Sequence, residues 1–475
     1  MSLRSRAFDR MRTQAAELQR RTLRQLLAVG SRTAFGHDHG LNGGMDADGF
    51  AAAVPVRDYD AMRPYIDRML EGESDVAWRG RTEWFARSSG TTSDRSKYIP
   101  VTREALRVNH ARGMYDVAAM YVAMNPATRI FDGKTLTLGG SCRRSGNGAL
   151  IGDLSAILID RMPAVSGWLR LPARDTALAE DFDTKAEAIC RQCTNQNITS
   201  FAGVPSWNLV LMRRVLEYTG KSNLLEVWPG LELFVHGGMG FEPYRAAFAE
   251  LLPSDGFRYM ETYNASEGFF AMADDPSRDD MLLMTGYGVY YEFRQGDRVC
   301  PLEGVRTGER YAMVITSCNG LWRYEIGDIV EFTSTEPYRI RLAGRTHQYI
   351  NAFGEELMAD NAERALAAAC RTTGAAIDEY TAAPIYMSLD SRGAHEWAIE
   401  FLRMPDDMQR FAEALDCELR RLNSDYDAKR RTTLEAPVVR VMPRGTFVAW
   451  LQRCGKNKVP HLCNDRRVID RLNDK

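Results

Sequence analysis

The chain has 475 residues and a formal charge of −2, with 45% hydrophobic and 26% charged residues. A chain of this length should divide into two or three domains, and its near-neutral charge argues against nucleic acid or an anionic membrane as a partner. Nine scattered cysteines favour reduced thiols in a cytoplasmic protein. Because no run of 18 apolar residues and no signal-peptide core occurs, the sequence predicts neither a membrane span nor export.

Taken in chain order, helical periodicity covers about residues 3–29 and returns over residues 58–70. Strands and helices then alternate up to about residue 340, which favours an α/β fold. Several strands follow one another within residues 281–332, which favours an antiparallel or barrel-like portion. After Gly344 the composition changes, and the remaining helices and strands predict a small α+β unit. We therefore expect one domain of residues 1–345 and a second of residues 346–475.

The most informative segment lies between two predicted strands and reads Ser88-Ser89-Gly90-Thr91-Thr92-Ser93-Asp94-Arg95-Ser96-Lys97. Backbone N–H groups and hydroxyls of such a loop can surround an anion, and the lysine adds a positive charge. A mobile turn is the ordinary alternative. The chain has only 8 Lys among its 61 basic residues, so a lysine at the end of this loop favours a phosphate site. The segment lacks the second glycine of the G-x-x-x-x-G-K-S/T loop.

Four later segments end predicted strands with glycine, polar or charged residues. They are His236-Gly237-Gly238, Tyr263-Asn264-Ala265-Ser266-Glu267, Tyr324-Glu325-Ile326-Gly327-Asp328 and Gly344-Arg345. Each segment alone is typical of a tight turn, and paired glycines also permit close approach of the backbone to a flat ligand. Their order along the chain carries more information than any one of them.

In that order the segments resemble those of adenylate-forming enzymes. They resemble more closely the auxin-responsive Gretchen Hagen family of acyl acid amido synthetases and its bacterial relatives. Two more matching segments are Val54-Pro55-Val56-Arg57-Asp58-Tyr59 and Lys458-Val459-Pro460. The resemblance covers nearly the whole chain. It implies an α/β fold with a large N-terminal domain of mixed sheets that binds ATP and the acyl acid, followed by a small mobile α+β C-terminal domain.

The resemblance also implies how the nucleotide is held. The loop from Ser88 to Ser93 would hold the β- and γ-phosphates of ATP together with Lys97. Gly237 and Gly238 would frame the adenine with the ring of Tyr263, which offers a stacking face. Ala265 and Ser266, which follow Tyr263 closely, are also expected to contact ATP.

The family further implies charged roles. Glu267 would bind Mg²⁺, since a hard cation that bridges phosphates needs an oxygen ligand from the protein. Asp328 would accept hydrogen bonds from both ribose hydroxyls, and Arg345 would contact the ribose or a phosphate. Lys458 would reach the acyl-phosphate oxygens during adenylation, and Lys456, two residues away, is an open alternative. The expected catalytic residues are therefore Lys458, Lys97 and Glu267.

Two positions depart from the wider superfamily. The aspartate that usually follows the Gly-Arg pair by two residues is His347 here, and the arginine that usually follows Tyr324 is replaced by Glu325. The nearest arginine is Arg323. These changes leave the hinge position, and any contact of that arginine with the nucleotide, open.

The predicted reaction has two steps, with ATP and Mg²⁺ as cofactors. A carboxylic acid attacks the α-phosphate and gives an acyl adenylate, and an amine, expected to be an amino acid, then forms the amide. One alternative is an acyl-CoA ligase, which product analysis would distinguish. The other is a catalytically inactive nucleotide-binding regulator, and the retained charged residues argue against that one. Residues 108–124 and 141–171 are expected to contribute to the acyl pocket, and a monomer or a weak dimer is expected.

Overall fold

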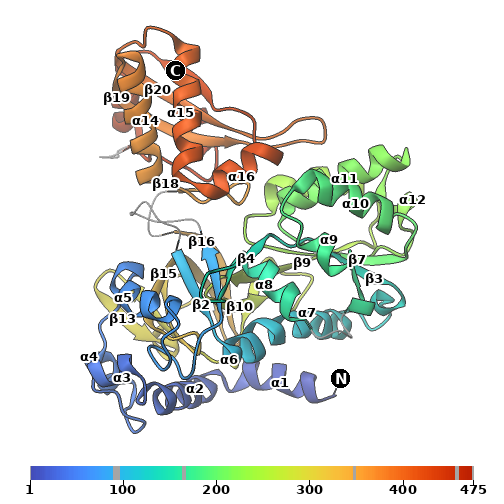
Figure 1. The fold of residues 1–475 in the computed structure, drawn as a ribbon, viewed down its shortest axis with the longest axis vertical. Helices are drawn as coiled ribbons and strands as arrows, with labels where there is room; N and C mark the ends of the chain where they lie inside the picture. Colours follow the sequence, from blue (N-terminus) through green and yellow to red (C-terminus); the bar gives the residue numbers. More distant parts are fainter. Residues whose placement is uncertain (1, 89–96, 163–166, 346–348, 455–458, 473–475) are drawn as a thin grey trace.

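The structure, a computed structural model, describes residues 2–88, 97–162, 167–345, 349–454 and 459–472. Its N-terminal part is built on a mixed sheet, and a smaller C-terminal unit stands at one end of it (Figure 1). The twelve strands follow the order β13 (Arg298–Pro301), β12 (Val289–Gln295), β14 (Arg310–Ser317), β15 (Leu321–Thr335), β16 (Tyr338–Arg345), β11 (Met281–Leu283), β10 (Gly268–Met272), β9 (Arg258–Ala265), β8 (Leu233–Gly237), β7 (Ile198–Gly203), β3 (Lys134–Thr137) and β6 (Arg170–Leu171).

The two halves of this sheet differ in strand direction. From β6 to β9 the strands are parallel, whereas from β9 to β13 every pair is antiparallel. The antiparallel portion predicted within residues 281–332 is therefore confirmed. Parallel strands need crossover helices, and these include α10 (Phe182–Cys193), α11 (Pro205–Thr219) and α13 (Arg245–Leu251). The strand β9 joins the two halves, so residues at its C-terminal end lie between them.

A second sheet of four strands carries the predicted phosphate loop. Its order is β2 (Lys97–Val101), β1 (Trp84–Ser88), β5 (Leu150–Gly152) and β4 (Cys142–Arg144). β1 and β2 form an antiparallel hairpin. The helix α5 (Tyr59–Leu70) packs near β2 and β15, with Tyr59, Met62, Ile66 and Met69 buried at helical spacing.

The N-terminal periodicity belongs to two helices rather than the one that the sequence predicts. α1 (Ser2–Thr13) and α2 (Ala15–Gly30) meet at Gln14, whose φ of −131° and ψ of 28° leave the helical region. Neither Gly nor Pro stands at the break, so the sequence contains no signal for it. The apolar stripe of α2 is buried, as a packed surface helix requires.

The C-terminal unit begins with a short hairpin and continues as a three-stranded sheet with helices. Its elements are β17 (Tyr349–Ile350), β18 (Leu357–Met358), α14 (Ala359–Thr373), β19 (Ala376–Ile385), β20 (Ala394–Arg403), α15 (Met408–Leu422), α16 (Ser424–Thr432), β21 (Val438–Met442), α17 (Thr446–Cys454) and α18 (Arg467–Arg471). The small α+β unit predicted from composition is thus confirmed. Its apolar core is continuous with that of α10, α11 and α13.

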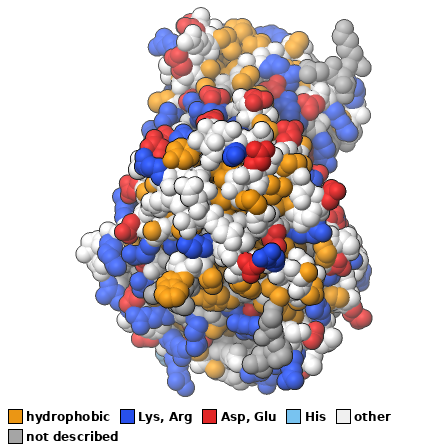
Figure 2. Space-filling model, turned by 90° about the vertical axis from the view of Figure 1, so that its right-hand side faces the viewer, with side chains coloured by type: hydrophobic (Ala, Val, Ile, Leu, Met, Phe, Trp, Pro, Cys, Tyr) orange, Lys and Arg blue, Asp and Glu red, His pale blue; other side chains and the backbone are white. Residues whose placement is uncertain are grey.

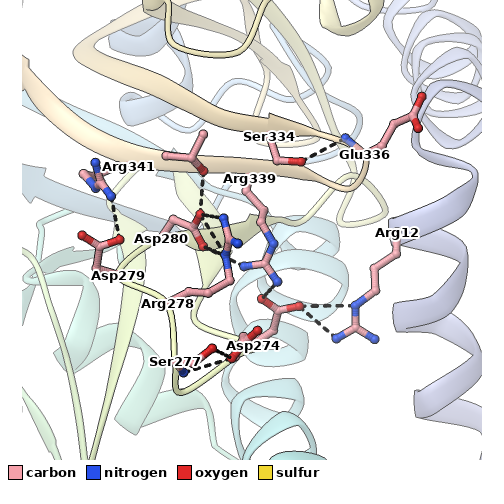
Figure 3. Close-up of polar contacts among 12 residues, drawn as sticks. Arg12, Asp274, Ser277, Arg278, Asp279, Asp280, Ser334, Glu336, Arg339 and Arg341 are labelled. Carbon is pink, nitrogen blue, oxygen red and sulfur yellow. Dashed lines mark hydrogen bonds and ion pairs between the residues drawn. The ribbon is translucent and has the colours of Figure 1, made fainter.

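A buried ion cluster fastens α1 to the sheet (Figure 3). Arg339 on β16 binds Asp274 at 2.7 Å and Asp280 at 2.8 Å, and Arg12 on α1 binds Asp274 at 2.9 Å. Arg278 and Thr333 also donate to Asp280. Because each carboxylate meets more than one donor, the cluster is closely neutralised.

The surface shown in Figure 2 carries charges of both signs, with Lys and Arg side chains interspersed among Asp and Glu side chains. This agrees with the near-neutral formal charge of the chain. Within the described ranges, no helix is both long enough and apolar enough to cross a membrane.

Candidate active site

The β1–β2 hairpin brings the two ends of the predicted phosphate loop together. Ser88, the last residue of β1, is paired directly with Lys97, the first residue of β2. Residues 89–96 between them, which include Ser89, Gly90, Thr91, Thr92 and Ser93, lie outside the described residues. Their predicted contacts with ATP stay predictions, whereas the hairpin defines the position of Lys97.

Lys97 is a half-buried lysine whose ammonium lies 5.6 Å from the centre of the Tyr59 ring. Tyr59 is itself fixed, because its hydroxyl accepts a hydrogen bond of 2.9 Å from the backbone of Tyr98. Burial lowers the pKa of Lys97, and the carboxylates of Glu267 and Glu356 oppose that shift. The ammonium therefore lies among carboxylates.

Glu267 occupies a tight turn between β9 and β10. Ala265 and Gly268 are paired, so Ser266 and Glu267 form a two-residue connection. Asn319 donates from Nδ2 to the Glu267 carbonyl at 3.1 Å and holds the turn in place. The side chain is 7% exposed, and burial raises the pKa of Glu267 to about 7 against the opposing charge of Lys97. A nearby cation would stabilise the ionised form of such a buried carboxylate.

Asp328 lies on β15 and binds two partners. Its Oδ2 accepts from the Tyr263 hydroxyl at 2.5 Å, and its Oδ1 accepts from Arg345 Nε at 2.7 Å. The Tyr263 ring is 5% exposed and packs against Phe270 at 5.0 Å between centroids. The contact that the structure shows for Tyr263 within the site is the hydrogen bond from its hydroxyl to Asp328. Stacking of its ring on adenine stays a prediction.

Arg345, the last residue of β16, connects the sheet to the C-terminal unit. Besides Asp328 it binds Glu356 Oε1 at 3.2 Å, and its guanidinium lies 5.0 Å from the centre of the Tyr349 ring. The sequence motifs predict no role for Glu356. Its only sequence signal is a carboxylate shortly after the Gly-Arg pair, and that pattern alone does not distinguish it from Glu355.

The glycine pair ends β8 beside the same strand β9. A Cβ at Gly237 would lie 2.3 Å from the Thr262 carbonyl oxygen, so close strand approach alone requires glycine there. Gly238 has a φ of +82°, and its carbonyl accepts from Asn351 Nδ2 at 3.2 Å. The pair therefore has structural reasons of its own, and its contact with adenine stays a prediction.

The departures from the superfamily pattern have structural explanations. Arg323 forms a buried ion pair with Glu292 at 2.9 Å and donates to the Val54 carbonyl at 2.7 Å. Glu325 binds Arg294 through two hydrogen bonds of 2.5 and 2.7 Å. Both residues thus hold the framework. His347 and the two candidate lysines, Lys456 and Lys458, lie outside the described residues.

The structure therefore brings Lys97, Glu267, Tyr263, Asp328 and Arg345 together. They come from β2, the β9–β10 turn, β9, β15 and β16, and the charges of Lys97, Glu267, Asp328, Arg345 and Glu356 influence one another. We call this set of five charged residues the site cluster. No group of three His, Cys, Asp or Glu that could hold a metal occurs within the described part of the chain. Glu267 alone fits Mg²⁺ only if phosphates and water supply the other ligands, which is the usual arrangement for that ion.

Three comparisons with known proteins agree with this geometry. Profiles of the GH3 family match along the chain: the N-terminal domain at residues 4–147 and 141–257, the central domain at 282–345 and the C-terminal domain at 360–467. The chain belongs to the GH3 family. The family predicted from the motif order is therefore confirmed.

Among GH3 relatives, the chain is 24% identical over 404 residues to the jasmonoyl–L-amino acid synthetase JAR6 of Nicotiana attenuata, covering 68% of each protein. It is 24% identical over 457 residues to the indole-3-acetic acid-amido synthetase GH3.8 of Oryza sativa subsp. indica, covering 79% of this chain and 74% of that protein.

Solved structures confirm the fold. The GH3.15 acyl acid amido synthetase in complex with 2,4-DB superposes with a TM-score of 0.65 at 18% identity, covering 98% of this chain and 95% of that one. A 2-hydroxyisobutyryl-CoA ligase superposes with a TM-score of 0.61 at 15% identity, covering 98% and 91%. The predicted adenylate-forming fold, with a large N-terminal part and a small C-terminal part, is confirmed.

Proposed function

We propose that this GH3 protein is an ATP-dependent ligase that joins a carboxylic acid to an amine, with an amino acid as the acceptor. The acid would attack the α-phosphate, so that a C–O–P bond forms and pyrophosphate leaves. The amine nitrogen would then attack the acyl carbon, AMP would leave, and the nitrogen would lose its proton to solvent. Membership of a family whose relatives are named amido synthetases supports this reaction.

The observation that carries the proposal is the convergence of the site cluster. Lys97 follows the predicted phosphate loop in the sequence and is paired with Ser88, and it would compensate charge on the β- and γ-phosphates. Asp328 keeps free lone pairs beside Tyr263 and Arg345, so the two ribose hydroxyls can still donate to it. These residues mainly position and electrostatically stabilise the reactants, because the mixed anhydride itself drives the amide step.

Mg²⁺ is part of the proposal, with Glu267 as the protein ligand. The ion would neutralise phosphate charge when bound. Glu267 fits because it is a buried carboxylate whose proton affinity is raised and which faces a lysine rather than a full set of donors. Residue Lys458 is proposed to stabilise the acyl phosphate, from a C-terminal domain of residues 346–475 that moves against residues 1–345. A cytoplasmic location and a monomeric or weakly dimeric state belong to the same proposal.

A pyrophosphate-release screen across carboxylic acids tests the first step, and repeating it with a panel of amino acids tests the second. We expect Lys458→Ala to slow adenylate formation sharply with little loss of ATP affinity. Glu267→Ala should impair Mg²⁺-dependent turnover. Activity of both variants at the wild-type level would refute the site assignment.

Transfer to a thiol is the second candidate, since the fold superposes almost equally well on a CoA ligase. Product analysis separates the two reactions. An amide formed with an amino acid supports the first proposal, and a thioester formed with CoA supports the second.

A further inference from the structure

The first hairpin of the C-terminal unit rests on the start of α11 and on the glycine turn after β8. Tyr244 donates from its hydroxyl to the Ala352 carbonyl at 2.5 Å, and Ser206 donates to the Phe353 carbonyl at 3.0 Å. Val204 contacts the positions that a Cβ would take on both Gly238 and Gly354, at 3.6 and 3.9 Å. We call the contact between the hairpin and residues 203–208 the hairpin seam.

Lys429, on α16, extends its ammonium into the hairpin seam. Its Nζ lies 4.1 Å from the centre of the Trp207 ring, and a Cβ on Gly354 would lie 3.2 Å from Nζ. Gly354, with a φ of +88°, thus leaves space in front of the ammonium. The residue is 6% exposed, which is rare for lysine.

Among the described residues, the Lys429 ammonium has neither a hydrogen bond nor an ion pair, only the face of Trp207. Three carboxylates act on the Lys429 charge, and none forms an ion pair with it among the described residues. Asp425, four residues earlier on α16, has the largest effect. Glu355 accepts from His395 at 2.8 Å, and Asp153 accepts from the Ser141 backbone at 2.7 Å. A buried ammonium with three unused donors is costly. Lys185 is equally buried but donates to the Gly139 carbonyl at 2.5 Å, so burial alone does not explain the state of Lys429.

Three more buried polar atoms at the seam lack partners within the described part of the chain. They are Trp207 Nε1, Asn208 Oδ1 and His236 Nδ1. Gly203 lies beside both Asn208 and His236: a Cβ on it would lie 2.9 Å from Asn208 Nδ2, and His236 is its backbone partner on β8. Buried polar groups in native proteins are nearly always paired. Unpaired atoms also occur elsewhere in the described residues, so these three support a ligand only together with the unpaired ammonium of Lys429.

We propose that the hairpin seam binds the acceptor amino acid and that Lys429 Nζ holds its carboxylate. This assignment rests on the proposed function and specifies its second substrate. A carboxylate supplies the acceptors that the ammonium lacks, and such charge-assisted hydrogen bonds are stronger than neutral ones. Burial also lowers the pKa of Lys429 to about 8, which an anionic ligand would reverse. Because the seam adjoins Gly238, the amine end of the bound molecule would point toward the nucleotide.

The experiment compares amino acids with their carboxamides, which keep the amine and lose the negative charge. Pyrophosphate exchange first identifies an acid that is activated without any acceptor. Amide formation is then measured with alanine and alaninamide, and with the best amino acid and its amide. In Lys429→Met we expect kcat/KM for the amino acid to fall at least tenfold through KM, with the carboxamide changed less than threefold. Comparing the ratio between variants cancels the different basicities of the two amines.

Two matched variants sharpen the test. Lys185→Met removes an equally buried ammonium and should keep the wild-type ratio, whereas Lys429→Arg keeps the charge and should retain most of the preference. An unchanged ratio in Lys429→Met, with pyrophosphate exchange intact, overturns the acceptor assignment alone. Should Lys429→Met fail to fold, the loss of preference in Lys429→Arg overturns it. Absence of pyrophosphate exchange with every acid overturns the proposed function, and this assignment with it.

Discussion

Two groups of charges beside the twelve-stranded sheet differ in how completely they are neutralised. In the ion cluster of Figure 3, Asp280 is 3% exposed and accepts from Arg278, Thr333 and Arg339. Burial works to raise the pKa of Asp280, yet these donors outweigh it and hold the pKa well below its usual range. In the site cluster, burial raises the pKa of Glu267 to about 7, although Lys97 opposes it.

The difference separates charges that neutralise one another from charges that are left incompletely neutralised. Arg339 and its two carboxylates satisfy one another and connect α1 to β16. Glu267 and Lys97 carry opposite charges without a direct ion pair, and each has a pKa shifted toward its neutral form. Incomplete neutralisation in a buried place is typical of functional sites.

Breaking the ion cluster should have the largest effect on stability. Asp280→Asn removes the counter-charge of Arg278 and leaves Arg339 with Asp274 alone. Loss of one partner from a buried ion pair costs about 3–5 kcal/mol. The free energy of unfolding in urea measures the loss.

The adjacent carboxylate provides the control. Asp279 is paired with Arg341, but its side chain is 84% exposed. Asp279→Asn should therefore change the free energy of unfolding by less than about 1 kcal/mol. If the two variants lost the same stability, the distinction between a buried structural cluster and its exposed edge would be wrong.

Lys97→Met should leave the fold intact and impair chemistry. Removing a preorganised charge that faces developing negative charge lowers a rate by about 100- to 1,000-fold. Pyrophosphate exchange measures this step, and Lys221→Met, on the surface, is the control. Exchange within threefold of the wild type would remove Lys97 from the site.

The smallest effect is a pH-dependent gain in stability for Glu267→Gln without ligands. The pKa of Glu267 is raised in the folded protein from an ordinary value of 4.5 to about 7, so the folded form binds the proton more tightly. The stability this contributes is present below pH 4.5 and is lost as the pH rises through 7. At pH 8 the glutamine variant should be more stable than the wild type by on the order of 2 kcal/mol relative to the difference at pH 5.

Thermal unfolding at the two pH values measures this gain. Glu250→Gln, at an exposed position, should behave alike at both. A Glu267→Gln variant whose stability relative to the wild type does not change with pH would mean that the Glu267 carboxyl titrates normally.

The sequence predicted the elements that follow hydrophobic periodicity and turn residues. The helix at residues 58–70 and the small C-terminal unit are found with bounds close to those expected. The break at Gln14 was missed because it depends on how α1 packs against α7 (Ala111–Met124) and α2, and not on a local breaker.

Only the site residues that lie in recognisable sequence motifs could be predicted. Motif order predicted Glu267, Asp328 and Arg345 as site residues, and the structure brings them together, whereas their roles stay predictions. The positions of Glu356 and Lys429 could not be predicted, because their contacts join residues more than ten positions apart in the sequence. Arg345 meets Glu356 only through the hairpin, and Lys429 meets Trp207 only through the docking of α16 on α11.

The continuous apolar core beneath the seam has a consequence for turnover. Phe353, Leu366 and Trp397 of the C-terminal unit belong to the same core as Trp228 and Phe234. If the unit swings between the two chemical steps, apolar area must come apart and meet water, at about 25 cal/mol per Å². The apolar contact between the two parts of the chain would then slow the domain movement in each catalytic cycle. A weaker contact would favour movement of the C-terminal unit, and a stronger contact would favour the domain arrangement of this structure.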